Sequence, residues 1–268
     1  MKATLLGFAV LIASTAIAAP PKRVDDFVEI KAGTPVTIRP DRAYLLFRTN
    51  SKETRAYVGI SPVFLRIPTT EEMQAYDAAK QNAARSRKPS DHSDFVYDEI
   101  RNIDSLRLAR ALEKSDDGRV MLIEALPGDY VLYGWGQADM LVTCLCLGTV
   151  SFAANAGTIT DLGTLLVAPA ADPSPIPELK AVTGLGATMN GHVVTLASAI
   201  RVANDSTPIP AAVAGKPIVR AQYRATGKFV SPFTFTINRL APLPGILGYD
   251  RGAVLDLVTG TVADDHYY

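Results

Sequence analysis

Short apolar runs alternate with Gly, Pro and Asn after residue 26, which is the pattern of strands joined by turns. Tyr44 to Phe47 form an unbroken apolar run, so we expect a strand that is buried on both faces there. Pro62 and Pro68 cannot donate a ladder hydrogen bond, so their strand should lie at a sheet edge or carry a bulge. The strands predicted in this part of the chain are residues 27–33, 35–40, 43–50 and 56–68.

The pattern changes at Thr69. A hydroxyl at Thr69 and a carboxylate three residues later at Glu72 form a capping box, in which each side chain satisfies a free amide of the first helical turn. The following residues are rich in Ala, Gln and Lys, which favour helix. We therefore predict one helix near residues 70–86, and its scarcity of large apolar side chains places it on the surface.

The strand pattern returns at residue 119. The tetrapeptide from Leu126 to Asp129 suits a type II turn, with Pro127 at the first corner and Gly128 at the second, so we predict a hairpin there. A further Leu-Pro-Gly turn is predicted at residues 243–245. The other predicted strands are residues 141–152, 156–169, 192–202, 217–225, 233–240 and 253–260.

These elements predict a mainly β protein, a β-sandwich with one surface helix. Residues 19–170 form the sandwich domain, with the helical insertion near 70–86. The segment 171–177 is a Pro-rich linker or a strap across the surface. The β-rich region 178–268 is either a second small domain or an extension of the first sheet.

The N-terminus has the layout of a cleavable secretory signal peptide. Lys2 precedes the apolar residues 5–13. The small residues Ser14, Thr15 and Ala16 follow, and the triplet Ala16-Ile17-Ala18 has small side chains at both positions that a signal peptidase contacts, so we expect cleavage after Ala18 in preference to Ala19. The apolar stretch is about half the length of roughly 20 residues that a membrane span requires. We therefore expect an exported protein, periplasmic or extracellular, without a transmembrane segment after cleavage.

The charge balance and the cysteine content indicate which partners to expect and what stabilises the fold. The chain has 27 basic and 27 acidic side chains, and loss of Lys2 leaves a net charge of −1. This balance offers no electrostatic reason to expect nucleic acid or an anionic membrane as partner. Hydrophobic residues make up 48% of the chain and there are only 2 cysteines, so the core, and not a disulfide framework, should hold the fold.

Segments ALPGDYVLYGWG (125–136), AYLLFR (43–48) and CLCLGTVSFAANAGTITDLG (144–163) carry a family resemblance. The first resembles the Leu-Pro-x-Gly-x-Tyr hairpin of prealbumin-like modules, such as those appended to carboxypeptidases, although Pro127 and Gly128 are adjacent here. Together the segments look like exported bacterial β-sandwich proteins. The resemblance implies a sandwich in the cell envelope, and it implies no catalytic residue.

The chain has three histidines that could serve as the base of a hydrolase. No Gly-x-Ser-x-Gly elbow is present. His92 lies among Asp91, Ser93 and Asp94, which are the residue types of a proton relay, but neighbours in one loop rarely reach triad geometry. His192 follows a turn and His266 lies in the C-terminal tail. A hydrolase built on His92 or His192 remains an alternative, and we predict no enzyme.

A soft-metal site is the second possibility. Met140, Cys144 and Cys146 offer thioether and thiolate ligands, which suit Cu(I), and residues two apart on a strand share a face. Cys144 and Cys146 also share parity with Val150 and Phe152, so core packing is the simpler interpretation. A disulfide between them would be strained on an extended strand, where two residues advance about 6.6–6.8 Å.

The remaining motifs are weak. Gly184 and Gly186 lack the third glycine of a dinucleotide fingerprint, because position 189 is Met189. Asn204 opens an Asn-Asp-Ser glycosylation acceptor sequence, and Trp135 between two glycines is expected to fill the core. We therefore predict no cofactor and a structural or binding role, with an envelope protein or a glycan as the possible partner.

Overall fold

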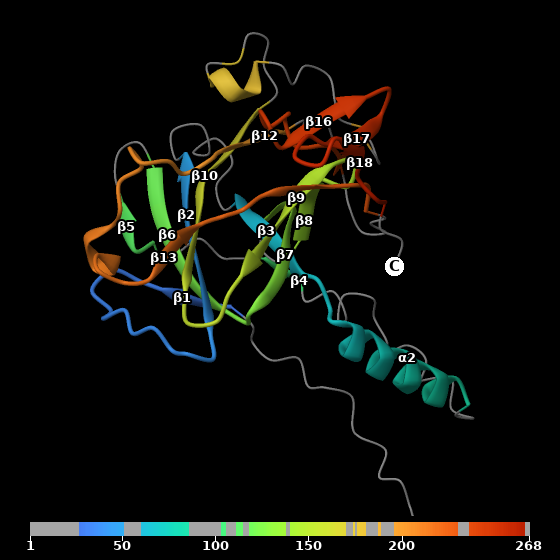
Figure 1. Cartoon of the computed structure of the whole chain (residues 1–268), viewed down its shortest axis with the longest axis horizontal. Helices are drawn as coiled ribbons and strands as arrows, with labels where there is room; N and C mark the ends of the chain where they lie inside the picture. The colour runs from blue at the N-terminus through green and yellow to red at the C-terminus, as the bar shows by residue number, and fades with distance from the viewer. Residues whose placement is uncertain are drawn as a thin grey trace, which may run out of the picture.

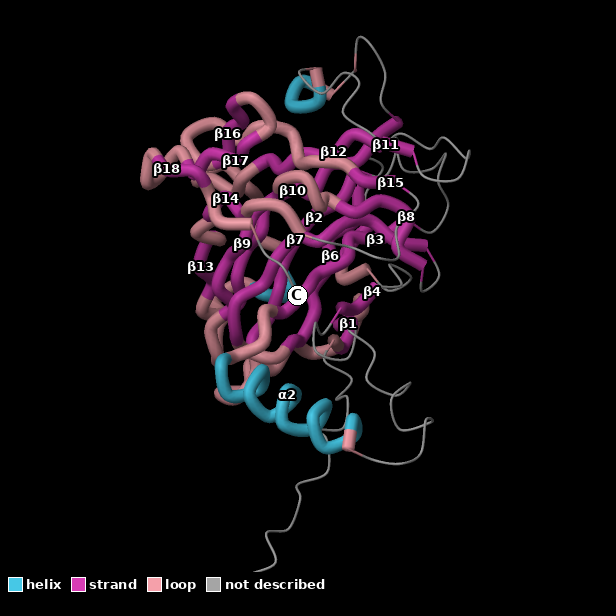
Figure 2. Tube along the Cα trace, turned by 90° about the vertical axis from the view of Figure 1, so that its right-hand side faces the viewer, coloured by secondary structure: helices cyan, strands magenta, loops and turns pink. Residues whose placement is uncertain are grey.

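The protein is a mainly β structure in which two large sheets pack face to face (Figure 1). The computed structural model describes residues 27–50, 60–85, 103–105, 111–114, 118–137, 140–169, 174, 176–180, 187–188, 196–229 and 236–265. Figure 2 shows the stacked strands from the side, with helix α2 outside them. The predicted fold class, a β-sandwich with one surface helix, is confirmed.

The first sheet has the strand order β1-β6-β2-β10-β12, with β5 paired to β6 and β13 to β10. The pairings of β10 with β2 and with β13 are parallel, and the others are antiparallel. Its strands are β1 (Val28–Ile30), β2 (Ala43–Asn50), β5 (Glu113–Lys114), β6 (Gly118–Ala125), β10 (Ile159–Pro169), β12 (Leu196–Arg201) and β13 (Ile218–Arg220).

The second sheet has the order β11-β15-β8-β7-β3-β4, and β9 joins it through β7 and carries β14. Its strands are β3 (Ile60–Arg66), β4 (Ile103–Ser105), β7 (Gly128–Gln137), β8 (Met140–Cys144), β9 (Thr149–Ala154), β11 (Ala187–Thr188), β14 (Arg224–Thr226) and β15 (Thr236–Ile237). A small third sheet contains β16 (Leu247–Asp250), β17 (Ala253–Asp256) and β18 (Thr261–Val262).

The main core lies between the two large sheets. Phe47 of β2 meets Phe64 of β3 edge-on, with 5.7 Å between the ring centroids. Phe64 in turn contacts Phe152 of β9, and Phe152 contacts Tyr223. Aromatic rings therefore form a continuous path from one sheet to the other, which is an arrangement that stabilises a sandwich beyond simple burial.

Strand β2 is buried on both faces, as its apolar run predicted. Leu45 and Phe47 point into the main core, whereas Tyr44 and Leu46 join an outer cluster with Val36. Val36 belongs to residues 35–40, which were predicted as a strand and instead form an irregular segment. That segment covers the outer face of β2, so its apolar residues serve packing and not sheet pairing.

The turn after Leu126 joins the two sheets and does not close a hairpin. Strand β6 pairs with β2 and β1, whereas β7 pairs with β3, β8 and β9. The Tyr130 hydroxyl donates a 2.6 Å hydrogen bond to the Leu126 carbonyl oxygen, which is the geometry of a tyrosine corner. The hairpin prediction was wrong because the turn residues specify a reversal but not the partner of the next strand.

Two strand predictions joined segments that the structure separates. Residues 141–152 contain a turn between β8 and β9, and residues 217–225 divide into β13 and β14, which join different sheets. The prediction of an edge or a bulge for the strand with Pro62 is confirmed by the bulge: β3 carries a register shift between Val63 and Phe64, and it lies between β7 and β4. The predicted turn at Leu243 is confirmed, and Leu243 bridges to Leu247 across it.

Helix α2 (Thr70–Ala84) confirms the predicted helix and projects away from both sheets (Figure 1). The Thr69 hydroxyl accepts the Glu72 amide at 3.2 Å, and a Glu72 carboxylate oxygen accepts the Thr69 amide at 2.7 Å, so the capping box forms in both directions. The guanidinium of Arg66, at the end of β3, donates to both carboxylate oxygens of Glu72. This bidentate ion pair fixes the direction in which the helix leaves the sheet.

The C-terminal region extends both sheets. Its strand β12 pairs with β10, and β14 and β15 pair with β9 and β8. Part of the Pro-rich segment is described: Ile176 and the short helix η2 (Pro177–Leu179) pack on the outer face of β10 and β12. A second short helix, η3 (Ala211–Val213), buries Val213 against β2. Within the described ranges no helix has the length and apolar character of a membrane span.

Candidate functional site

The two cysteines form a disulfide between the end of β8 and the following turn. Their Cα atoms lie 5.1 Å apart, because Cys146 is in the turn and not on an extended strand. That separation falls within the usual range for disulfides, so the predicted strain rested on the wrong local structure. Cys144 is 0% and Cys146 3% exposed, which agrees with the expectation of burial.

The cluster that surrounds the disulfide differs from the one predicted. Val150 and Phe152 lie in the main core, whereas Cys144 and Cys146 pack on the outer face of the second sheet with Tyr133 and Phe229. The turn after Cys144 breaks the alternation of faces that the sequence parity assumed. Met140 opens β8 opposite Gln137. The disulfide would have to be reduced before its two sulfurs could bind a soft metal as thiolates.

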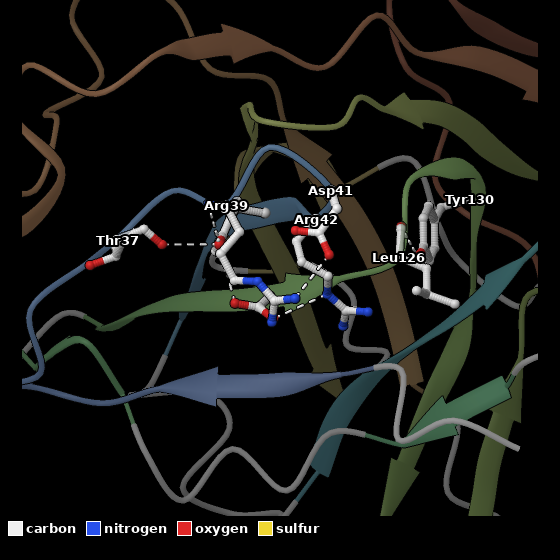
Figure 3. Close-up of polar contacts among 8 residues, drawn as sticks. Thr37, Arg39, Asp41, Arg42, Leu126 and Tyr130 are labelled. Carbon is white, nitrogen blue, oxygen red and sulfur yellow. Dashed lines mark hydrogen bonds and ion pairs between the residues drawn. The ribbon is translucent and has the colours of Figure 1, made fainter.

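Charged side chains, some buried and some exposed, gather where the irregular segment meets the first sheet (Figure 3). Glu124 of β6 accepts contacts from two arginines: Arg42 Nε lies 3.0 Å and Arg39 Nη1 3.3 Å from its Oε1. The Tyr44 hydroxyl lies 3.1 Å from the other Glu124 carboxylate oxygen and also accepts the Arg39 amide at 3.0 Å. This arrangement ties the segment before β2 to β6.

Electrostatics in this cluster follow from burial and pairing. Burial and the neighbouring Glu124 charge raise the pKa of Tyr44, so its phenol stays protonated at neutral pH. The hydrogen bond from Arg39 lowers the pKa of the exposed Asp41 carboxyl, and it raises that of Arg39.

A second buried ion pair links the two central strands of the first sheet. Arg48 of β2 donates to both carboxylate oxygens of Asp161 in β10, at 2.7 and 3.2 Å. Asp161 Oδ1 also accepts the Gly163 amide, and Arg48 donates further to the Pro208 carbonyl oxygen. Burial and the charge of Asp161 raise the pKa of Tyr223, whose hydroxyl donates to the Leu162 carbonyl oxygen.

These arrangements hold the sandwich together. A general acid or base must reach a reacting atom, and the carboxylates of Glu124 and Asp161 are committed to arginines. Among the described residues, no group of three or more His, Cys, Asp and Glu side chains is placed to bind a metal ion. Sequence reasoning missed both ion pairs, although Arg48 and Asp161 inside otherwise apolar strands were the available signal.

No protein family, curated protein or solved structure matched this chain.

Several sequence candidates lie outside the described residues. They are Ala18, Ala19, His192, His266, the pair Gly184 and Gly186, and the loop from Asp91 through His92 to Asp94. Trp135 is described and is 1% exposed within the main core, so the core interpretation of this residue is confirmed. Asn204 lies exposed in a turn, where its side-chain oxygen accepts the Ser206 amide.

Proposed function

We propose that this chain is an exported, non-catalytic β-sandwich protein of the cell envelope, periplasmic or extracellular, with a structural or binding role. The observation that carries the proposal is the Cys144–Cys146 disulfide. Structural disulfides persist in oxidising compartments and are rare in the cytosol. The disulfide therefore supports the export that residues 1–18 predict.

The pairing of the acids supports a non-catalytic role. The buried carboxylates of Glu124 and Asp161 and the partly exposed carboxylate of Glu72 each form an ion pair with an arginine. A side chain held this way positions strands and loops, and it is poorly placed to move a proton to or from a substrate. An envelope protein or a glycan is the partner class we propose for the binding role.

Export is tested on the natural product of the intact gene. N-terminal sequencing should find Ala19 as the first residue of protein recovered outside the cytoplasm. Thiol titration of that protein after denaturation should detect no free thiol until reductant is added, and the Cys144→Ser/Cys146→Ser variant controls for reagent background. A cytosolic product that retains Met1 and titrates two thiols would refute the proposal.

Catalysis and metal binding are tested separately. Broad ester, peptide and glycan substrates should show no turnover with the purified protein. The alternative is a Cu(I) or thiol-redox protein that uses Cys144 and Cys146. It predicts stoichiometric copper in the wild type after reduction, lost in the double serine variant. We expect no stoichiometric copper in either.

A further inference from the structure

The turn closed by the disulfide is where the C-terminal region attaches to the second sheet. The Cys144 carbonyl oxygen accepts the Asn238 amide at 2.7 Å, and the Cys146 carbonyl oxygen accepts the Phe229 amide at 2.9 Å. The Leu147 amide donates to the Asn238 carbonyl oxygen at 3.0 Å, and the Leu240 amide donates to the Gly148 carbonyl oxygen at 2.9 Å. Four backbone hydrogen bonds from one stretch of chain thus converge on residues 144–148.

Side chains reinforce the same attachment. Phe229 is 3% exposed and packs in the outer cluster with both cysteines, where its ring meets Tyr133 edge-on. Ile237 packs against the same cluster. Beyond the disulfide, the Tyr249 ring of the third sheet lies directly over Gly148, and its hydroxyl donates to the Leu240 carbonyl oxygen at 2.6 Å. The turn must keep its shape for these contacts to persist together.

We propose that the Cys144–Cys146 disulfide is a redox-sensitive latch that holds Phe229 and residues 236–240 on the second sheet. The inference rests on the proposed export, which supplies the oxidising compartment in which the disulfide forms. A cross-link between residues two apart closes a very short loop, so it removes little entropy from the unfolded chain. Its effect should therefore be local, on the turn and on the strands attached to it, and not on the sandwich as a whole.

Opening the latch requires an external dithiol. The dithiol gives two electrons and two protons to the disulfide, the S–S bond breaks, Cys144 and Cys146 become thiols, and the dithiol becomes a disulfide. Attack must occur on a sulfur, and both cysteines are buried in one cluster with Phe229. This cluster must open first, so the rate of reduction should follow its local opening.

Amide hydrogen exchange on the purified mature protein tests the latch. After reduction by a dithiol, confirmed by alkylation of both thiols, the amides of Phe229, Asn238 and Leu240 should exchange at least about tenfold faster. The amides of Leu45 and Leu122, on β2 and β6, should keep their protection. The Cys144→Ser/Cys146→Ser variant should reproduce this pattern, and reduction of the wild type gives the answer if that variant does not fold.

Two further variants separate a latch from ordinary packing. Val131→Ala removes buried volume from the same outer cluster and leaves the disulfide in place, so it should not speed exchange of the Phe229, Asn238 and Leu240 amides. Phe229→Ala should speed reduction of the disulfide at least about tenfold, because it removes part of the cluster that buries the two cysteines.

Unchanged amide exchange after complete reduction, or an equal rise in the exchange rates of all amides, would overturn the latch. Because purified oxidised protein is used, that outcome says nothing against export, which N-terminal sequencing decides.

Discussion

At the scale of single residues, Gly148 is the most constrained position in the attachment of the third sheet. Its φ of +148° lies in the range that favours glycine. A Cβ at this position would lie 2.6 Å from Cε1 of Tyr249 and 3.0 Å from Cγ2 of Val254. The half-buried Tyr249 ring and the packed Val254 would have to shift to make room, so both the backbone conformation and the available space disfavour a side chain here.

Gly148→Ala should lower the free energy of unfolding by about 1–3 kcal/mol, as overpacking does in other cores. Urea denaturation of the purified protein measures this loss. Gly33→Ala is the matched control, because Gly33 also has a positive φ but no atom lies within 4 Å of the Cβ position. It should cost only about 1 kcal/mol, and an equal loss in the two variants would show that the Tyr249 contact is unimportant.

At the scale of elements, helix α2 depends on its first turn, because it projects away from the sheets. The Met73 amide donates to the Thr69 carbonyl oxygen, and Glu72 closes the capping box. Burial alone would raise the pKa of Glu72, but hydrogen bonds from Arg66 and the Thr69 amide outweigh it and lower the pKa. The ionised carboxylate is therefore the form that holds the helix start.

Because this pKa lies below its unfolded value of about 4.3, the stabilisation is complete above that pH. It is lost as the pH falls through the folded-state pKa. Glu72→Gln should therefore speed exchange of the Met73 and Gln74 amides near neutral pH, and the difference from wild type should disappear in acid. Glu71→Gln is the control, since Glu71 shares the first turn and lies outside the capping box. A pH-independent difference between wild type and Glu72→Gln would contradict this account.

At the scale of the whole molecule, the Arg48–Asp161 pair joins distant parts of the chain. It links β2 to β10, and through the Pro208 carbonyl oxygen it also holds the loop that precedes β13. The side chains are only 13% and 6% exposed. Removing one partner leaves the other as an unpaired buried charge, which is far more costly than removing both.

Arg48→Met should therefore destabilise the protein by about 3–5 kcal/mol, measured by urea denaturation. Adding Asp161→Asn should recover part of this loss, because the amide keeps an acceptor for Gly163. The Arg220–Asp205 ion pair is the exposed counterpart, with side chains 48% and 98% exposed. Arg220→Met should change stability by less than about 1 kcal/mol. Losses that simply add in the Arg48/Asp161 double variant would argue against a coupled pair.

Features whose partners are close along the chain could be predicted from the amino-acid sequence. The Thr69–Glu72 capping box spans three residues, and the buried run from Tyr44 to Phe47 requires only that both faces of one strand be covered. Composition and turn residues also sufficed for the mainly β class, because strand and turn preferences are local. These predictions agree with the structure at nearly the residues expected.

The pairing of strands and the meeting of charges depend on the whole fold. The residues from Leu126 to Gly128 favour a hairpin turn, yet β6 and β7 belong to different sheets, because strand pairing depends on competing edges elsewhere in the molecule. Cys144 and Cys146 are only two positions apart, but their disulfide depends on the turn that ends β8 between them. Arg48 and Asp161 meet across 113 positions of sequence. A contact of that kind forms when packing of the core brings distant segments together, and the residues next to either partner do not specify it.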